Sequence, residues 1–409
     1  MKFKPVKEQL EYLKKGAVDL VREEELKAKL VRACETGQPL RVKVGFDPSA
    51  PDIHLGHTVL MRKMRHFQQM GHSVIFLIGD FTGMIGDPTG RSKTRPQLTR
   101  EEIIANAETY KKQAFKILDR ERTIVDFNSR WLGSLGSEGL IRLAGRYTVA
   151  RMLERDDFAK RFANGHAIGI HEFLYPLAQG YDSVALKADV ELGGTDQLFN
   201  LLVGRDIMKE YALEPQVVMT TPLLEGTDGV EKMSKSLENY IGVDEPPREI
   251  YGKIMSISDD LMWKYYELLT DLSKDEIEKK KKEVTGKKLH PKTAKSELAK
   301  MIITELCSHE EAESAEKEFE KIFVDRDLPN EVEEYTRKCM KEKIWLPRLM
   351  VEAGIFKSNG EALRVVKQGG VYLDGSRVEE DAILEIDASK PAEHMLKVGK
   401  RRFLKIIFK

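Results

Sequence analysis

The stretch VGFDPSAPDIHLGHT, residues Val44–Thr58, decides the fold. It predicts the end of a strand, a proline-rich turn and a helix that opens at His54-Leu55-Gly56-His57. Such a turn brings two imidazoles, a glycine without a side chain and several helix-start N–H groups to one edge of a sheet, which suits a polyphosphate. Two histidines on one helical turn are more often a capping, solvated or metal-binding pair than a catalytic one. Whether this pair is catalytic depends on whether the rest of the chain supplies a nucleotide enzyme around it.

Composition sets broad limits on the class of protein. The 409 residues predict two to three domains, and 41% hydrophobic with 33% charged residues is ordinary for a soluble protein. Because 67 Lys and Arg balance 67 Asp and Glu, any nucleic-acid site must be a local basic patch. The three cysteines, Cys34, Cys307 and Cys339, lack metal-binding spacing, which favours a reducing compartment and argues against a structural zinc. The charged N-terminus and the lack of a membrane-length apolar run predict a cytoplasmic protein without membrane segments.

Strand and helix patterns alternate through the first half of the chain. Residues 40–44 alternate with period two, residues 73–78 form a short apolar run, and residues 123–127 predict another strand. We expect further strands at residues 183–190 and 216–220. This alternation predicts a doubly wound, Rossmann-like α/β fold with a parallel sheet, whose ligands bind beyond the carboxyl ends of the strands.

The pattern also predicts three domains. Residues 1–245 form the Rossmann-like domain, with a helical insertion at about residues 128–165 that favours a packing or dimer surface. Residues 246–335 are helical, and the basic segment at residues 279–295 is expected to be a loop between helices. Residues 344–409 form a small α+β domain with two short helices and a hairpin at GGVYLDGSRV.

Two basic segments could meet phosphate. The segment GMIGDPTGRSKTRP, residues 83–96, fails the Walker pattern because Gly86 and Gly90 enclose three residues and Arg91 stands where Lys is expected. A loop whose Arg91, Lys93 and Arg95 bind phosphate or an RNA end and a solvated loop are equal alternatives for it. The loop Lys232-Met233-Ser234-Lys235-Ser236 places two ammonium groups among small polar residues, so that it could close over a triphosphate. Taken alone, a surface loop is an equal alternative.

Tyr175, Gln179 and Asp182 are spaced so that all three lie on one face of a helix. Pro176 indicates that this helix begins or kinks there. A carboxylate and an amide on an otherwise apolar face suggest recognition of a small polar ligand. A capping network is the alternative.

Together, the histidine turn, the lysine loop and their order resemble class I aminoacyl-tRNA synthetases. The details are most similar to bacterial tyrosyl-tRNA synthetases over essentially the whole chain. The matching motifs are Gly45-Phe46-Asp47-Pro48, Gly79-Asp80, Tyr175 with Gln179 and Asp182, and Gly194-Thr195-Asp196-Gln197. The last domain resembles the small RNA-binding domain that ends the bacterial members.

The resemblance implies a tyrosine–tRNA ligase that forms tyrosyl-adenylate from L-tyrosine and ATP and then charges tRNA(Tyr). It implies Mg²⁺ on the ATP phosphates, no resident metal, and a homodimer formed through the helical insertion. Catalysis would fall to His54, His57, Lys232 and Lys235. ATP would be held by Asp47, Ser49, Gly56, Gly193, Asp196, Met233, Ser234 and Lys235. Tyrosine would be held by Asp80, Tyr175, Gln179, Asp182 and Gln197, with Asp182 accepting the phenol proton.

The terminal domain supplies the local basic patch. RNA contacts are expected from Arg348, Arg364, Lys367, Arg377, Lys400, Arg401 and Arg402. RNA affinity from such a patch falls steeply with salt.

Two positions depart from the family pattern. Lys43 stands where many members carry a Tyr that shares the substrate phenol, and Met233-Ser234 stand where many have Phe-Gly. The alternative within enzymes is a tryptophan–tRNA ligase, against which Asp182 and the RNA-binding domain argue. A non-catalytic RNA-binding descendant would be expected to have lost one of the histidines or Lys235, and a sulfate- or phosphate-activating nucleotidylyltransferase would not need the RNA domain.

Overall fold

The computed structural model divides into two compact units, Met1–Glu316 and Lys317–Lys409. It describes residues 3–48, 52–89, 99–323, 333–339, 343–378, 385–399 and 402–409. Seven residues named above lie outside the described ranges: Ser49, Gly90, Arg91, Lys93, Arg95, Lys400 and Arg401.

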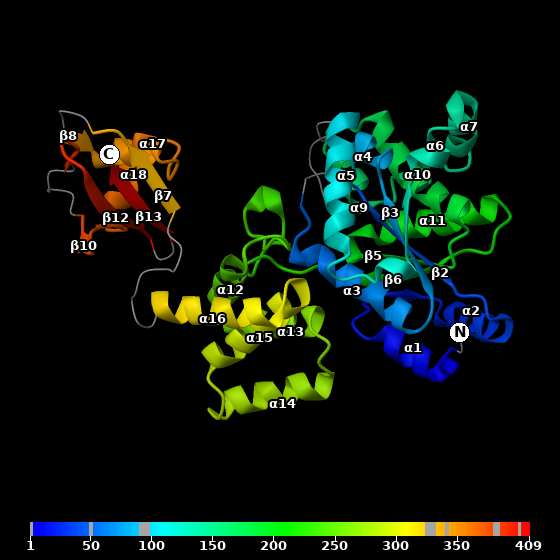
Figure 1. Cartoon of the computed structure of the whole chain (residues 1–409). Helices are drawn as coiled ribbons and strands as arrows, with labels where there is room; N and C mark the ends of the chain where they lie inside the picture. Colours follow the sequence, from blue (N-terminus) through cyan, green and yellow to red (C-terminus); the bar gives the residue numbers. More distant parts are fainter. Residues whose placement is uncertain are drawn as a thin grey trace. The chain divides into compact units, whose positions relative to one another are not determined.

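The first unit is built on a six-stranded sheet in its described residues (Figure 1). Its order is β1-β6-β5-β2-β3-β4, parallel except for β1, which pairs antiparallel with β6. The strands are β1 (Leu20–Val21), β2 (Arg41–Phe46), β3 (Ser73–Ile78), β4 (Thr123–Phe127), β5 (Val190–Gly194) and β6 (Val217–Thr221). The central strands are buried along almost their whole length, as expected of a parallel sheet covered on both faces. The predicted α/β fold is confirmed.

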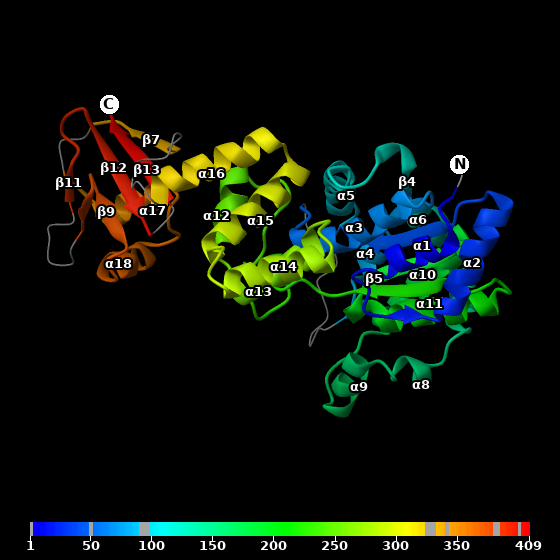
Figure 2. The ribbon, with the colours of Figure 1, turned by 90° about the horizontal axis from the view of Figure 1, so that it is seen from below.

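Helices surround the sheet, and an insertion of short helices follows β4. They are α1 (Val6–Lys14), α2 (Glu23–Thr36), α3 (Leu55–Gln69), α4 (Thr82–Ile85), α5 (Arg100–Ala114), α10 (Ile170–Leu186) and α11 (Leu198–Glu210). The insertion holds α6 (Ser129–Leu132), α7 (Gly136–Ala144), α8 (Val149–Met152) and α9 (Asp156–Ala163). Figure 2 shows α8 and α9 projecting away from the sheet.

Several local predictions are confirmed, and one strand is wrong. The strands at residues 73–78 and 123–127 are as predicted, and α5 begins with a capping box formed by Thr99 and Glu102. The strand expected at residues 183–190 is wrong, because α10 continues to Leu186 and β5 begins only at Val190. A short apolar run fits a buried helix as well as a buried strand. Helix α10 also begins six residues before Pro176, which lies inside it.

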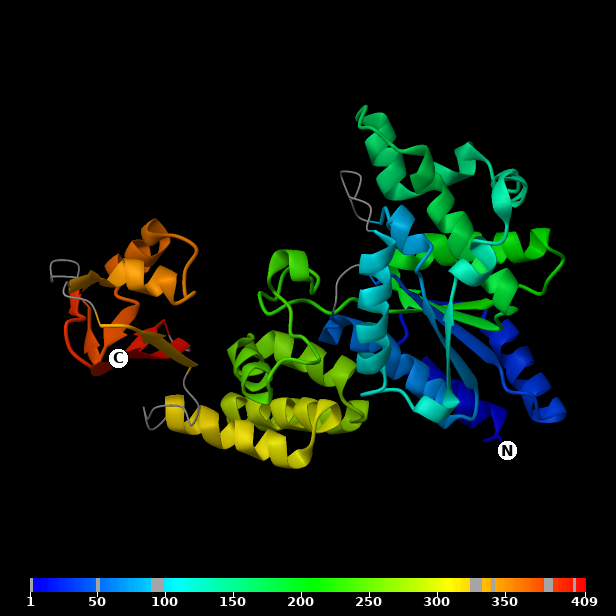
Figure 3. The same cartoon turned by 45° about the horizontal axis from the view of Figure 1, so that its top comes forward.

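The helices after the sheet pack together, as Figure 3 shows. They are α12 (Pro247–Ser256), α13 (Asp259–Leu269), α14 (Lys274–Thr285), α15 (Pro291–Leu306) and α16 (His309–Phe323). The loop expected at residues 279–295 is therefore wrong for most of its length. The Ser273–Glu276 capping box starts α14, and Pro291 at the start of α15 leaves only residues 286–290 between the helices.

After the end of α16, the described residues of the second unit form a five-stranded sheet, a separate strand pair and two helices. The sheet order is β10-β9-β12-β13-β7, and β11 pairs separately with β8. The elements are β7 (Glu333–Arg337), β8 (Lys343–Trp345), α17 (Leu346–Glu352), α18 (Asn359–Lys367), β9 (Val371–Leu373), β10 (Ser376–Arg377), β11 (Glu385–Asp387), β12 (Ala392–Val398) and β13 (Arg402–Phe408). The predicted hairpin is β9–β10, closed by Asp374 and Gly375 at φ 48° and 80°. Because β7 pairs with β13, the sheet of this unit takes in residues before position 344.

Candidate active site

A cavity of about 540 Å³ lies at the carboxyl ends of β2, β3, β5 and β6. This is the edge at which ligands of doubly wound folds bind. Fourteen residues predicted from the sequence line it: Asp47, His54, Gly56, His57, Tyr175, Gln179, Asp182, Gly193, Asp196, Gln197, Lys232, Met233, Ser234 and Lys235. Segments that are about 180 residues apart in the chain therefore share one cavity.

The histidine turn begins α3. His54 is its N-cap residue, and its backbone N–H donates to Nδ1 of His57 at 3.3 Å. The two rings lie 3.9 Å apart between centroids. Burial, together with the positive charge of Lys235, lowers the pKa of His54 to about 2 and that of His57 to about 4. Both imidazoles are therefore neutral near pH 7 and can bond to phosphate oxygens only as dipoles.

Gly56 lies where the histidine turn meets the lysine loop. A Cβ at this position would come within 2.9 Å of Cε1 of His54 and 3.6 Å of Cβ of Met233. Because the first distance is shorter than Cβ contacts allow, a side chain here would displace the His54 ring. Glycine therefore lets the two segments approach each other.

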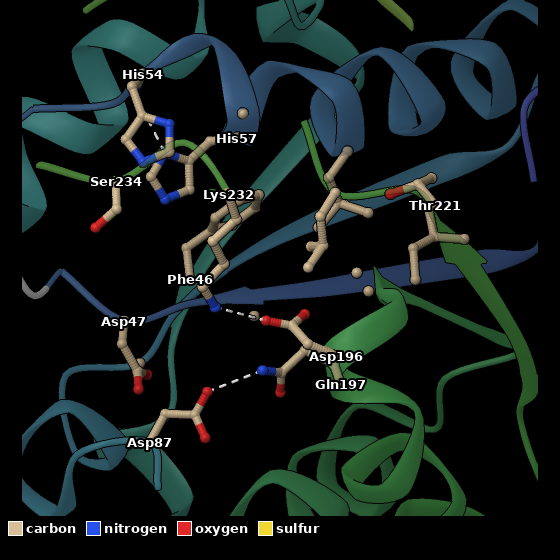
Figure 4. A pocket seen from close by; sticks show the side chains of 18 of the residues that line it. Phe46, Asp47, His54, His57, Asp87, Asp196, Gln197, Thr221, Lys232 and Ser234 are labelled. Carbon is tan, nitrogen blue, oxygen red and sulfur yellow. Dashed lines mark hydrogen bonds and ion pairs between the residues drawn. The ribbon is translucent and has the colours of Figure 1, made fainter. Parts of the chain in front are cut away.

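The two lysines of the loop are held by carboxylates at the cavity. Nζ of Lys232 lies 3.0 Å from Oδ2 of Asp196, and Nζ of Lys235 lies 3.3 Å from Oδ2 of Asp52. Figure 4 shows Lys232 reaching across to Asp196 beneath the histidine pair. The loop itself is fixed by Asn239, whose Oδ1 accepts from the N–H of Ser234 at 2.8 Å. The carboxylates thus keep both ammonium groups beside the cavity.

Asp47 organises one wall of the cavity. Its Oδ2 accepts from the hydroxyl of Tyr175 at 2.8 Å, and its Oδ1 accepts from Oγ1 of Thr82 at 2.7 Å. A Cβ on Gly79 would lie 2.0 Å from Oδ1 of Asp47, so only glycine fits beside this carboxylate.

Asp182 is buried at the cavity. It accepts from Nε1 of Trp131 at 2.7 Å and from Nδ2 of Asn128 at 3.2 Å. Burial raises its pKa to about 7, an effect that Lys43 and the two donors partly oppose. The site therefore holds a carboxylate whose charge changes near neutral pH.

The structure does not bring Asp80 to the cavity. Both of its oxygens are taken by Ser129, one by the backbone N–H at 2.9 Å and one by the hydroxyl at 2.6 Å. Asp80 instead ties the turn after β3 to the start of α6. Asp87 lines the cavity in its place and accepts from Nε2 of Gln197 at 2.8 Å (Figure 4). The sequence signal for Asp87 is Gly86-Asp87-Pro88, which lies within the segment that fails the Walker pattern.

The described RNA-binding candidates all lie in the second unit. Arg348 is on α17, Arg364 and Lys367 are on α18, and Arg377 and Arg402 are on β10 and β13. Arg348 pairs with Glu352 at 2.9 Å, whereas the guanidinium of Arg402 donates to the carbonyl of Ile355 at 2.8 Å. Arg402 thus contributes to the structure of this unit.

Comparison with known proteins identifies the family of this chain. Residues 35–324 match the family described as tRNA synthetases class I (W and Y). The tyrosine–tRNA ligase of Geobacter sulfurreducens is 57% identical over 403 residues, which cover 98% of this chain and 99% of the relative. That of Desulfotalea psychrophila is 54% identical over 408 residues, covering 100% of both. The solved tyrosyl-tRNA synthetase of Archaeoglobus fulgidus, complexed with L-tyrosine, is 26% identical with a TM-score of 0.62, covering 76% of this chain and 99% of that chain.

The fold, the histidine turn and the lysine loop define a class I aminoacyl-tRNA synthetase. At these identities over the full length, the chain belongs to the bacterial tyrosyl-tRNA synthetases. The predicted activity as a tyrosine–tRNA ligase is confirmed, and the tryptophan alternative is not favoured. Among the described residues, no helix combines the length and apolar character that crossing a membrane requires.

Proposed function

We propose that this cavity activates L-tyrosine with ATP and then passes the tyrosyl group to the 3'-terminal ribose of tRNA(Tyr). One observation carries the proposal: the histidine turn, the lysine loop and a buried carboxylate line the same cavity. The tyrosine carboxylate attacks the α-phosphate of ATP, and pyrophosphate leaves. Since that carboxylate is already a nucleophile, the first step needs no general base.

Positioning and charge stabilisation then supply the catalysis. The neutral His54 and His57 orient the phosphates as hydrogen-bonding dipoles. Lys232 and Lys235 exchange their carboxylate partners, Asp196 and Asp52, for the leaving pyrophosphate. Mg²⁺ accompanies the ATP phosphates as part of the substrate and neutralises their charge.

The nucleotide lies along the segments that join the strand ends. We assign adenosine and phosphate contacts to Asp47, Ser49, Gly56, Gly193, Asp196, Met233, Ser234 and Lys235. Support for this assignment comes from the cavity lining, which includes every residue of the set that the structure describes, Ser49 being outside the described ranges. Gly193 packs tightly, since a Cβ there would lie 3.0 Å from Cδ1 of Leu201.

Two sets of polar groups line the end of the cavity that takes tyrosine, one for the backbone of the amino acid and one for its phenol. Asp87, Tyr175, Gln179 and Gln197 receive the ammonium and backbone of tyrosine, with Asp87 taking the role first expected of Asp80. Asp182 accepts a hydrogen bond from the phenol hydroxyl. Phenylalanine lacks the hydroxyl that would donate to this buried carboxylate and is therefore rejected, and tyrosyl-tRNA synthetases are themselves the known example of this discrimination, at a ratio of about 10⁵.

The pair Asp87→Asn and Asp80→Asn tests this end of the site. Asp87→Asn is expected to raise the KM for tyrosine about tenfold or more in tyrosine-dependent ATP–pyrophosphate exchange, because a charged partner of the ammonium is lost. Asp80→Asn serves as the matched control and is expected to leave that KM within about twofold. The reverse order of effects would overturn the assignment.

The remaining parts of the chain serve RNA binding and assembly. Residues 344–409 carry the tRNA-binding patch, and residues 246–335 face the anticodon side of the tRNA. Residues 1–245 perform the chemistry. The protein acts in the cytoplasm. The insertion forms the homodimer contact. Large apolar side chains there are exposed, namely Ile141, Val149, Phe162 and, at the start of α10, Ile170. Sedimentation that finds a monomer would refute the dimer.

A further inference from the structure

A fully buried ion pair lies beside the amino-acid end of the cavity without lining it. Lys43 on β2 and Glu191 on β5 are register partners on neighbouring strands. Nζ of Lys43 lies 2.9 Å from Oε1 of Glu191, with side-chain exposures of 0% and 1%. Because burying two charges is costly, such a pair is expected only where its hydrogen bonds are satisfied.

The hydrogen bonds of the pair are satisfied, largely by one turn of α10. Nζ of Lys43 donates to the carbonyl of Gln179 and to Oγ of Ser183, both at 3.0 Å. Glu191 accepts from Oγ of Ser183 at 2.8 Å, from Nε2 of Gln179 at 3.3 Å and from Nε2 of Gln216 at 2.7 Å. The ammonium group thus has three acceptors, one for each proton.

This turn of α10 also presents the residues that face the substrate. Gln179 and Asp182 line the cavity, and the pair contacts positions 179 and 183 on either side of Asp182. Trp131 and Asn128 hold the carboxylate of Asp182 from the segment that follows β4. The ion pair therefore fixes the backbone of the turn, while the indole and amide donors fix the carboxylate.

We propose that the Lys43–Glu191 pair is a positioning element for amino-acid selection, which holds the α10 turn so that Asp182 meets the tyrosine hydroxyl and rejects phenylalanine. The inference rests on the proposed role of Asp182 as the phenol acceptor. A linked electrostatic effect supports it, because Lys43 favours the charged form of Asp182 and Glu191 opposes it. The effect of Lys43 is the larger of the two, so on balance the pair favours the charged carboxylate that the phenol hydroxyl needs as an acceptor.

The test compares kcat/KM for tyrosine and phenylalanine in pyrophosphate exchange by the full-length chain. The double variant Lys43→Met/Glu191→Gln removes both charges, leaves no buried unpaired ion and keeps an acceptor for Gln216. We expect the tyrosine-to-phenylalanine ratio to fall about tenfold or more, through a higher KM for tyrosine, since small misplacements of contact groups cost this much. An unchanged ratio would overturn the proposal.

A matched control is offered by a second buried ion pair that contacts α10. Nη1 of Arg161 lies 2.6 Å from Oε2 of Glu172, and their side chains are 3% and 4% exposed. Neither residue lines the cavity. Arg161→Met/Glu172→Gln is expected to leave the ratio unchanged even where it lowers stability. A similar fall in the ratio for both double variants would mean that any buried pair on α10 has this effect, and would also overturn the proposal.

Two further variants keep the test decisive. Asp182→Asn should abolish the discrimination between tyrosine and phenylalanine. If it does not, the proposed function of the site fails. If Asp182→Asn abolishes it but the Lys43–Glu191 double variant keeps the tyrosine-to-phenylalanine ratio, this inference alone fails. Should the double variant not fold, Ser183→Ala removes the hydroxyl that joins the pair to α10 while both charges stay paired, and the ratio is expected to fall in the same direction. The charged or titratable groups around Asp182 are Lys43, Glu191 and Tyr175. Removing the charge of Glu191 is expected to move the acidic limb of kcat/KM for tyrosine to lower pH, and an unmoved limb would contradict the proposal.

Discussion

Replacing Asp182 by Asn should make the protein inactive toward tyrosine and, at alkaline pH, more stable. Burial raises the pKa of Asp182 from 3.8 to about 7. The folded protein therefore binds more protons than the unfolded chain between about pH 4 and pH 7, so this group lowers the free energy of unfolding as pH rises through that window. The full penalty, present above pH 7, is about 4 kcal/mol.

The pH dependence separates this penalty from the lost hydrogen bonds. Asn keeps one oxygen acceptor for Trp131 and Asn128, and leaving a donor unpaired costs about 1–3 kcal/mol at any pH. Between pH 5 and pH 8.5 the stability of the variant relative to the wild type should still rise by about 3 kcal/mol. For a folded unit of this size, that corresponds to roughly 3–6 °C in the difference between melting temperatures.

The assay is thermal unfolding of both proteins at pH 5 and pH 8.5, with pyrophosphate exchange measured alongside. Asp156→Asn, at an exposed position of α9, is the control and should change neither midpoint by more than about 1 °C. A difference between Asp182→Asn and wild type that stays constant with pH would refute the raised pKa. Near-normal tyrosine exchange by the variant would refute the assignment of the phenol acceptor.

Other expectations concern the remaining parts of the site. Gly56→Val should abolish adenylate formation by displacing His54, with a melting temperature within a few degrees of wild type; an active variant would contradict the role of this glycine. The profile of kcat/KM for tyrosine should rise with pH through an acidic limb near pH 7, where Asp182 ionises, and no limb from the histidines should appear above pH 5. A limb at pH 6–6.5 that His57→Gln removes would disprove neutral histidines. Deletion of residues 344–409 should leave pyrophosphate exchange intact and cripple tRNA charging, and equal loss of both activities would count against an RNA-binding role.

Much of the fold followed from local signals, because these were strong. The strands at residues 73–78 and 123–127 each have a pattern that no overlapping helical pattern competes with. The strand expected at residues 183–190 failed because Val184–Leu186 is an apolar run too short for its period to distinguish the end of a helix from a strand.

The site could be predicted only as far as motif order allowed. Spacing on one helical face correctly grouped Tyr175, Gln179 and Asp182 at one cavity. Which of two aspartates turns toward that cavity depends on the path of the chain after β3, and there Ser129 captures Asp80 while Asp87 remains at the wall. The partner of Lys43 was equally hidden, since Glu191 lies 148 residues later and meets it only through the pairing of β2 with β5.

The most direct test of the central claim is amino-acid-dependent ATP–pyrophosphate exchange by the full-length protein, with tyrosine, tryptophan and phenylalanine compared under the same conditions. The cavity with Asp182 predicts strong exchange with tyrosine and, by comparison, negligible exchange with the other two. Exchange with tryptophan at or above the level seen with tyrosine, or equal exchange with phenylalanine, would contradict it.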